Sequence, residues 1–175
     1  MPERIAVVGI GNILMGDDGV GVAVIEALRR ETLPDSVELY DAGTALPDVL
    51  AVIGSADRTI FVDSCRSGGE PGSVIRSLLG PEDWRSEPLG DSLHDIGVAH
   101  AVQMHCLAGG NLGEIVVIGI EPLDVAPREG LSPALAARVP AVIEIVRREL
   151  SADDRTDGGR LVQPTPSEKR RGERE

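Results

Sequence analysis

The sequence predicts a three-layer α/β/α sandwich, in which helices cover both faces of a mostly parallel, twisted sheet of about five strands with one antiparallel edge strand. Short runs rich in Val and Ile alternate with segments of helical periodicity, the order typical of such a fold. Hydrophobic residues make up 42% of the chain but aromatic residues only 2%, so Val, Ile, Leu and Ala must form the core. With 175 residues, the chain is long enough for one domain with a full core.

The chain begins with a strand, a loop and a helix. A β-branched run that ends in glycine predicts a buried strand over residues 4–9, followed by a glycine-rich loop. Apolar residues at helical spacing then predict a helix over 17–31. Asp17 or Asp18 is expected to be its N-cap, because a short acidic side chain accepts hydrogen bonds from the first amide groups of a helix.

The middle of the chain repeats this pattern. Strands are expected at 36–41, 58–63 and 73–78, the last of them at an edge of the sheet. A helix is expected over 45–56, where Pro47 is tolerated because it falls in the first turn. A polar loop follows the third of these strands.

The last part of the chain completes the pattern. A helix over 94–108 is expected to stop at a pair of glycines, and a β-branched run predicts a strand over 114–120. The final helix covers 131–150, where Pro140 is expected to kink or split it.

Charge divides the chain into two parts. Residues 151–175 hold six acidic and six basic side chains, so the whole formal charge of −12 lies in residues 1–150. We therefore expect one domain over 1–150 and a disordered tail over 151–175. The negative charge disfavours nucleic acid and anionic membranes as partners. Cys65 and Cys106 are too few for a disulfide framework, and no signal peptide or membrane span is recognisable, so a cytoplasmic location is expected.

Several common sites do not fit the motifs of this chain. The loop begins Gly9-Ile10-Gly11, but Leu14 stands where a dinucleotide fingerprint needs its third glycine. The serine-nucleophile motif G-x-S-x-G does not occur. Cys65 and His94 remain a formal nucleophile pair, although a small buried thiol after a strand is the favoured interpretation of Cys65.

Acidic residues follow three of the predicted parallel strands. Asp18 lies after the first strand and its loop, and Asp41 and Asp63 end the second and third. Because the carboxyl ends of parallel strands meet at one edge of the sheet, these residues are expected near a common rim. Taken alone, each acid has a structural explanation, as a helix cap or as a hydrogen-bond acceptor in its loop.

All three histidines lie in one short segment. On a helix, His100 and His105 would point about 140° apart, and His94 and His105 would be about 16 Å apart, so they cannot share one metal ion. His94 is the best candidate because it lies where the loop joins the helix, whereas His100 is expected to be a half-buried packing residue. Asp18, Asp63 and one histidine together would suit a divalent metal such as Ni, Zn, Mn or Fe.

Five short motifs, in this order over about residues 4–150, resemble those of the nickel–iron hydrogenase maturation endopeptidases. They are GIGNILMGDDGVG at 9–21, DAGT at 41–44, Asp63 at a strand end, SLHD at 92–95 and GIEP at 119–122. The resemblance implies the α/β fold and an endopeptidase that removes a C-terminal extension from the precursor of the hydrogenase large subunit, after nickel has been inserted.

The resemblance also implies a set of site residues. Asp18, Asp63 and His94 match the positions that are thought to contact nickel in the family, where some members have glutamate at the first position. The spacing from Asn12 favours Asp18 over Asp17 as the ligand. The nickel would belong to the substrate, so no permanently bound metal is expected. The catalytic role would fall on the same three residues, with a carboxylate, as in an aspartyl protease, or His94 as general base.

Two other functions remain as alternatives. Peptidyl-tRNA hydrolases resemble this N-terminus in their G-x-G-N loop, but they need a histidine soon after that loop and a basic face for RNA. A non-catalytic nickel-binding adaptor for hydrogenase maturation is the second alternative. The sequence leaves open which hydrogenase is served, where the bond is cut and whether the protein is a monomer.

Overall fold

The computed structural model describes residues 3–80 and 93–151, with the backbone alone for 93–97. Within these residues, five strands form one sheet in the order β2-β1-β3-β5-β4. The strands are β1 (Ile5–Ile10), β2 (Val37–Gly43), β3 (Arg58–Ser64), β4 (Val74–Leu79) and β5 (Glu114–Ile120). The helical elements are the 3-10 turn η1 (Gly16–Gly19), α1 (Val20–Leu28), α2 (Leu46–Ile53), α4 (Leu93–Leu107), α5 (Pro133–Ala136) and α6 (Val139–Leu150).

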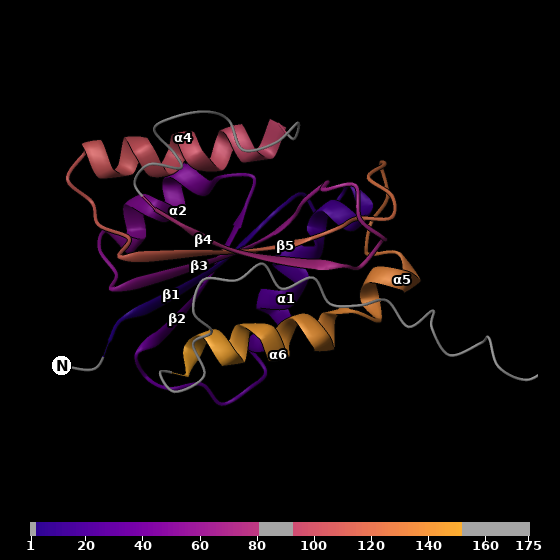
Figure 1. Ribbon diagram of the computed structural model, residues 1–175, viewed down its shortest axis with the longest axis horizontal. Helices are drawn as coiled ribbons and strands as arrows, with labels where there is room; N and C mark the ends of the chain where they lie inside the picture. The colour runs from indigo at the N-terminus through magenta and orange to yellow at the C-terminus, as the bar shows by residue number, and fades with distance from the viewer. Residues whose placement is uncertain (1–2, 81–92, 152–175) are drawn as a thin grey trace, which may run out of the picture.

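The three-layer architecture is confirmed. Strands β2, β1, β3 and β5 are parallel, and β4 pairs with β5 in the antiparallel sense at the edge of the sheet. Helices α2 and α4 cover one face, and α1 and α6 cover the other (Figure 1). The expected strand positions agree with the observed ones to within about two residues.

Alternation along the central strands divides the core between the two faces. On β3, Ile60 and Val62 pack with the residues of α1 and α6, whereas Phe61 packs with those of α2 and α4. The next residue on the Phe61 face is Asp63, because side chains alternate along a strand. Asp63 therefore lies at the carboxyl end of β3, on the side covered by α2 and α4.

The start of the first helix differs from the prediction. Instead of one helix over 17–31, η1 precedes a shorter α1, and the N-cap position of α1 is Gly19 rather than Asp17 or Asp18. Gly21 explains the close approach of α1 to the sheet, since a Cβ there would lie 2.2 Å from the carbonyl oxygen of Val62. The carboxylates of both aspartates accept hydrogen bonds from other segments of the chain, as described below.

The predicted split of the last helix is confirmed. Pro140 lies in the first turn of α6, where its missing amide hydrogen costs nothing, and α5 ends four residues earlier at Ala136. The chain between these helices turns at Arg138, whose backbone still lies in the right-handed helical region.

Three charged side chains lie buried between α6 and the sheet. Glu149 accepts hydrogen bonds from Arg76 Nε at 2.6 Å and from Arg58 Nη2 at 2.5 Å. Arg58 on β3 and Arg76 on β4 are 0% and 4% exposed, and Glu149 is 3% exposed. Glu114 at the surface lies 3.1 Å from Arg58 Nη1. One buried carboxylate thus fixes α6 to two strands, and its hydrogen bonds raise the pKa of Arg76.

The remaining expectations concern single segments. His100 is exposed, so the prediction that it packs half-buried is wrong: its side chain lies on the outer face of α4. The polar loop before α4 and the predicted tail over 151–175 lie outside the described residues, apart from their ends at Gly80, Leu93 and Ser151. Among the helices that the structure describes, none combines the length and apolar character needed to cross a membrane.

Candidate active site

Two of the three predicted site residues come together at the carboxyl edge of the sheet. Asp18 Oδ1 accepts a hydrogen bond of 2.9 Å from Ser64 Oγ, and Asp18 Oδ2 accepts one of 2.8 Å from the amide of Asn12. Asp63 Oδ1 accepts a hydrogen bond of 2.7 Å from the amide of Ser64. Asp18 and Asp63 are only 3% and 5% exposed. One residue, Ser64, therefore holds both carboxylates.

The loop after β1 positions Asp18. Gly11 has a φ of 126°, and a Cβ there would lie 1.8 Å from the carbonyl oxygen of Asp18. Only glycine allows the loop to fold back this closely onto η1. The glycines of this loop thus serve backbone packing, which brings the amide of Asn12 to the Asp18 carboxylate.

Asp17 has a structural role that separates it from Asp18. It is fully buried and accepts hydrogen bonds from the amides of Leu123, Asp124 and Ser132 and from Ser132 Oγ, at 2.6–3.1 Å. Burial alone would raise the pKa of Asp17, but the hydrogen bonds from Ser132, Asp124 and Leu123 outweigh it and lower the pKa below the ordinary value. Asp17 therefore ties the segment after β5 to η1, which leaves Asp18 for the site.

This role predicts a pH-dependent stability. Because the folded-state pKa of Asp17 lies below its ordinary value of 3.8, its contribution to stability is complete above that value and is lost as the pH falls through the folded-state pKa. Asp17→Asn turns an amide group toward several N–H donors, and we expect it to cost about 1–3 kcal/mol at pH 7. Chemical denaturation at several pH values should show this difference narrowing below about pH 4.

The matched control for this prediction is Asp124→Asn in the same segment. Its side chain is exposed and pairs with Arg128 at the surface, so the change should be under about 1 kcal/mol. A difference between Asp17→Asn and the parent protein that stays constant down to pH 3 would contradict the structural role of the Asp17 carboxylate.

Asp41 belongs to the same edge but not to the same cluster. Its Oδ1 accepts a hydrogen bond of 2.9 Å from the amide of Gly43, and the side chain is exposed. This is the hydrogen-bonding role in its own loop that the sequence suggested for it.

The histidines are distributed along α4. His105 lies in the last turn, where its Nε2 is 3.0 Å from the carbonyl oxygen of Gly54, far from the carboxyl edge. His94 is the second residue of α4, and its side chain lies outside the described residues. Because α4 runs antiparallel to the strand that follows it, its first turn lies at the carboxyl edge, where Val98 and Asp63 border the same pocket. Among the side chains described, no three potential ligands of the His, Cys, Asp or Glu type cluster around one point.

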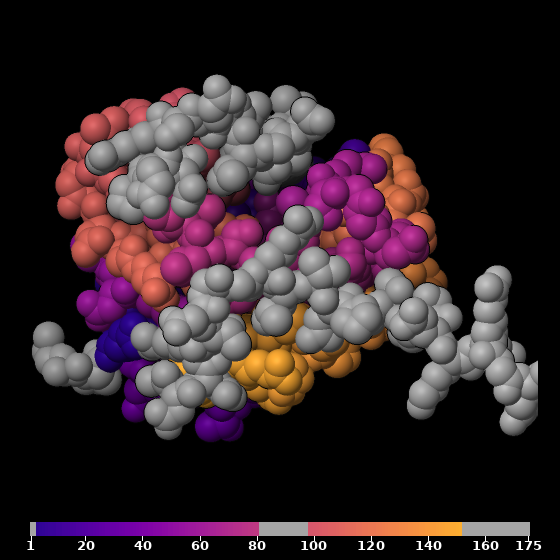
Figure 2. Space-filling model, in the orientation of Figure 1, coloured from indigo at the N-terminus to yellow at the C-terminus, as the bar shows by residue number. Residues whose placement is uncertain are grey.

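Glu121 organises the segment that follows β3. Its Oε2 accepts hydrogen bonds from the amide and the hydroxyl of Ser67 at 2.6 and 2.7 Å and from the amide of Gly69 at 3.2 Å. Figure 2 shows this segment (magenta) lying against the chain that follows β5 (orange). Glu121 lies in one of the motifs, but the sequence did not predict its role, because its hydrogen-bond partners lie more than 50 residues away.

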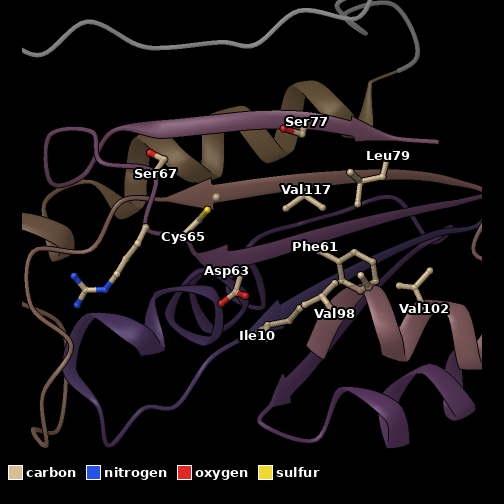
Figure 3. A pocket seen from close by; sticks show the side chains of 13 residues that line it. Ile10, Phe61, Asp63, Cys65, Ser67, Ser77, Leu79, Val98, Val102 and Val117 are labelled. Carbon is tan, nitrogen blue, oxygen red and sulfur yellow. The ribbon is translucent and has the colours of Figure 1, made fainter. Parts of the chain in front are cut away.

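A pocket of about 260 Å³ opens beside Asp63, between the sheet and α4 (Figure 3). Cys65, which is half-buried, also borders it, whereas Cys106 is exposed on the outside of α4. A nearly buried carboxylate beside an apolar pocket is an arrangement typical of enzyme sites.

Comparison with known proteins identifies the family. A family model described as "Hydrogenase maturation protease" matches residues 22–149. The "Hydrogenase 2 maturation protease" of Escherichia coli K12 is 32% identical over 147 residues, which cover 82% of this chain and 88% of the relative.

The chain belongs to the hydrogenase maturation protease family.

Solved structures of such proteases share the fold. The hydrogenase maturating endopeptidase HybD of E. coli superposes with a TM-score of 0.73 at 30% identity, over 84% of this chain and 91% of that one. The [NiFe] hydrogenase maturation protease HycI of Thermococcus kodakarensis gives a TM-score of 0.64 at 27% identity, over 85% and 92% of the two chains. The resemblance drawn from the sequence motifs is therefore confirmed, and this maturation protease is an enzyme that acts on peptide bonds. Neither the peptidyl-tRNA hydrolase nor the non-catalytic adaptor is supported.

Sequence reasoning missed the groups that position the site of this protease. Ser64, Asn12 and Glu121 received no role, although each bonds a carboxylate or carries one. Signals existed for them: Ser64 directly follows Asp63 at a strand end, and Asn12 and Glu121 lie within the motifs at 9–21 and 119–122. The assignment of Asp18, Asp63 and His94 as site residues stays a prediction.

Proposed function

We propose that this protease removes the C-terminal extension of the large-subunit precursor of a nickel–iron hydrogenase, and that it recognises the precursor by the nickel bound to it. The observation that carries the proposal is the pair of nearly buried carboxylates, Asp18 and Asp63, held by Ser64 at the carboxyl edge of the sheet. His94, in the first turn of α4, would complete the set from the same edge.

The chemistry of this donor set suits a metal that arrives with the substrate. Two carboxylates and one imidazole would occupy only part of the coordination sphere of a divalent ion such as nickel, so the remaining positions would be filled by ligands from the substrate. Precursor without the metal would lack this bridge and would dock less well. Asp18 and Asp63 would thus bind the metal of the precursor before the peptide bond is cut.

The residues of this chain also provide for the hydrolysis itself. Asp63 borders a pocket, so its carboxylate, or His94, would accept the proton of the attacking water as general base. The site lies at the strand ends of a rigid sheet, so these groups need little rearrangement before reaction.

The proposal is tested by mixing the purified full-length protein with large-subunit precursor prepared with and without nickel. We expect the nickel-loaded precursor to lose its extension, seen as a mass decrease, and the nickel-free precursor to remain intact. Equal cleavage of both would contradict nickel recognition. No cleavage of several loaded precursors would contradict the processing function.

A further inference from the structure

The pocket beside Asp63 is built from one face of the sheet. Alternation brings Phe61 and Asp63 of β3 and Val117 and Gly119 of β5 to the same side, and these residues are paired in register. Further residues from β1, β4 and α4 complete the walls: Ile10, Ser77, Leu79, Val98, Ala99 and Val102. Four strands thus form the floor and α4 forms the roof.

The pocket has a polar end and an apolar end. Figure 3 shows Asp63 and Cys65 at one end and the side chains of Phe61, Val117 and Val102 gathered toward the other. Gly119 is paired in register with Asp63 and therefore lies at the polar end. A Cβ there would come within 2.8 Å of Cys65 Cβ, so glycine at this position leaves room for Cys65 in the pocket wall.

The size of the pocket limits what it can hold. Its volume of about 260 Å³ lies below the roughly 300–1,000 Å³ of pockets that enclose a whole cofactor or drug-sized ligand. An apolar cavity of about 150 Å³ is known to hold benzene, so a branched aliphatic or aromatic side chain fits here with room for part of its backbone. The charged residues of the lining, Asp63 and Arg66, lie at and just after the end of β3. A charged side chain seated among the Phe and Val walls at the other end would lose its hydration, which is costly.

We propose that this pocket binds an uncharged, branched or aromatic side chain of the substrate polypeptide, next to the bond that is cut. This rests on the proposed function, because it takes the peptide bond to lie at Asp63. The continuity of the pocket with Asp63 carries the inference: a side chain seated against Phe61 and Val117 places its own backbone at the polar end, beside the carboxylate. The pocket therefore fixes which bond faces Asp63, whereas the metal fixes which precursor is accepted.

The experiment narrows the pocket from the helix side. Ala99→Phe places a large side chain in the roof, and Gln103→Phe adds the same side chain one turn along α4 at an exposed position outside the pocket. Both are tested on nickel-loaded precursors in which the residues on each side of the cut bond are replaced in turn by Ala, Leu, Phe and Asp.

At one of these positions we expect the parent protein and Gln103→Phe to cut Leu or Phe substrates faster than the Asp substrate. Ala99→Phe should lower kcat/KM for the large side chain by about 10–200-fold and leave the Ala substrate nearly unchanged. A second variant, Val117→Ala, widens the floor and should shift the preference toward the larger side chain, which keeps the test valid if Ala99→Phe does not fold.

The outcomes separate this proposal from the function on which it rests. If the parent protein cuts the precursors but Ala99→Phe and Val117→Ala leave the order of preference unchanged, the pocket is not a subsite. The same conclusion follows if folded Ala99→Phe loses activity equally on all substrates. If the parent protein cuts none of the precursors, the proposed function itself fails.

Discussion

Asp63→Asn is expected to lower kcat/KM for nickel-loaded precursor by about 10²–10⁴-fold, the range found when a general base is removed. The amide oxygen of asparagine still accepts the hydrogen bond that Asp63 receives from the amide of Ser64, so the fold should survive. What is lost is the negative charge and the proton-accepting oxygen beside the pocket. The rate of appearance of the shortened large subunit, followed by mass spectrometry, measures this directly.

The control for this experiment is Asp35→Asn, the same chemical change on an exposed loop at the opposite edge of the sheet. It should cut at the parent rate. Thermal melting of both variants shows whether the fold is intact. Full activity in a folded Asp63→Asn would remove Asp63 from the site and, with it, the central support of the proposed mechanism.

Glu149→Gln is expected to cause a large loss of stability. Breaking a buried ion pair by neutralising one partner costs about 3–5 kcal/mol, because it leaves buried charge without compensation. Here two guanidinium groups, those of Arg58 and Arg76, depend on the one buried carboxylate. For a domain of this size the loss corresponds to a decrease of about 6–20 °C in melting temperature.

Glu144→Gln on the same helix provides the comparison. Its carboxylate pairs with Arg147 at the surface, where both side chains are about half exposed. Such pairs contribute about 0–1 kcal/mol, so its melting temperature should change by only a few degrees. Similar small shifts for both variants would mean that the buried cluster contributes little to the stability of the fold.

Most of the fold could be predicted from local patterns. The strands are recognisable because β-branched runs end at glycine or aspartate, and the split before α6 because proline is acceptable only in a first helical turn. The helix start at 17–31 was wrong because short acidic residues resemble caps. Whether Asp17 and Asp18 instead reach Ser132 and Ser64 depends on contacts across 115 and 46 residues.

The sheet topology allowed part of the site to be predicted, but the contacts that complete the site could not be. Asp63 lies at the end of β3 and Asp18 in the turn η1 that follows β1, and the topology of a parallel sheet brings such residues to one edge. The residues that hold them in place, and the pocket made by Phe61, Val117 and α4, arise only when β3 and β5 pair. The buried cluster of Arg58, Arg76 and Glu149 could not be predicted either. Charged residues are usually exposed, and these three come from elements that are distant in the sequence.

The sheet order has a consequence for how the protein is made. Strand β5 lies between β3 and β4, although both of those precede it in the chain. During synthesis the edge of β3 therefore stays unpaired until residues 114–120 emerge, which takes several seconds at about 5–20 residues per second. An apolar strand edge exposed for that time can pair with another nascent chain. Aggregation during expression should thus depend on the translation speed between β3 and β5, and a pause within this interval should lower the yield of folded protein.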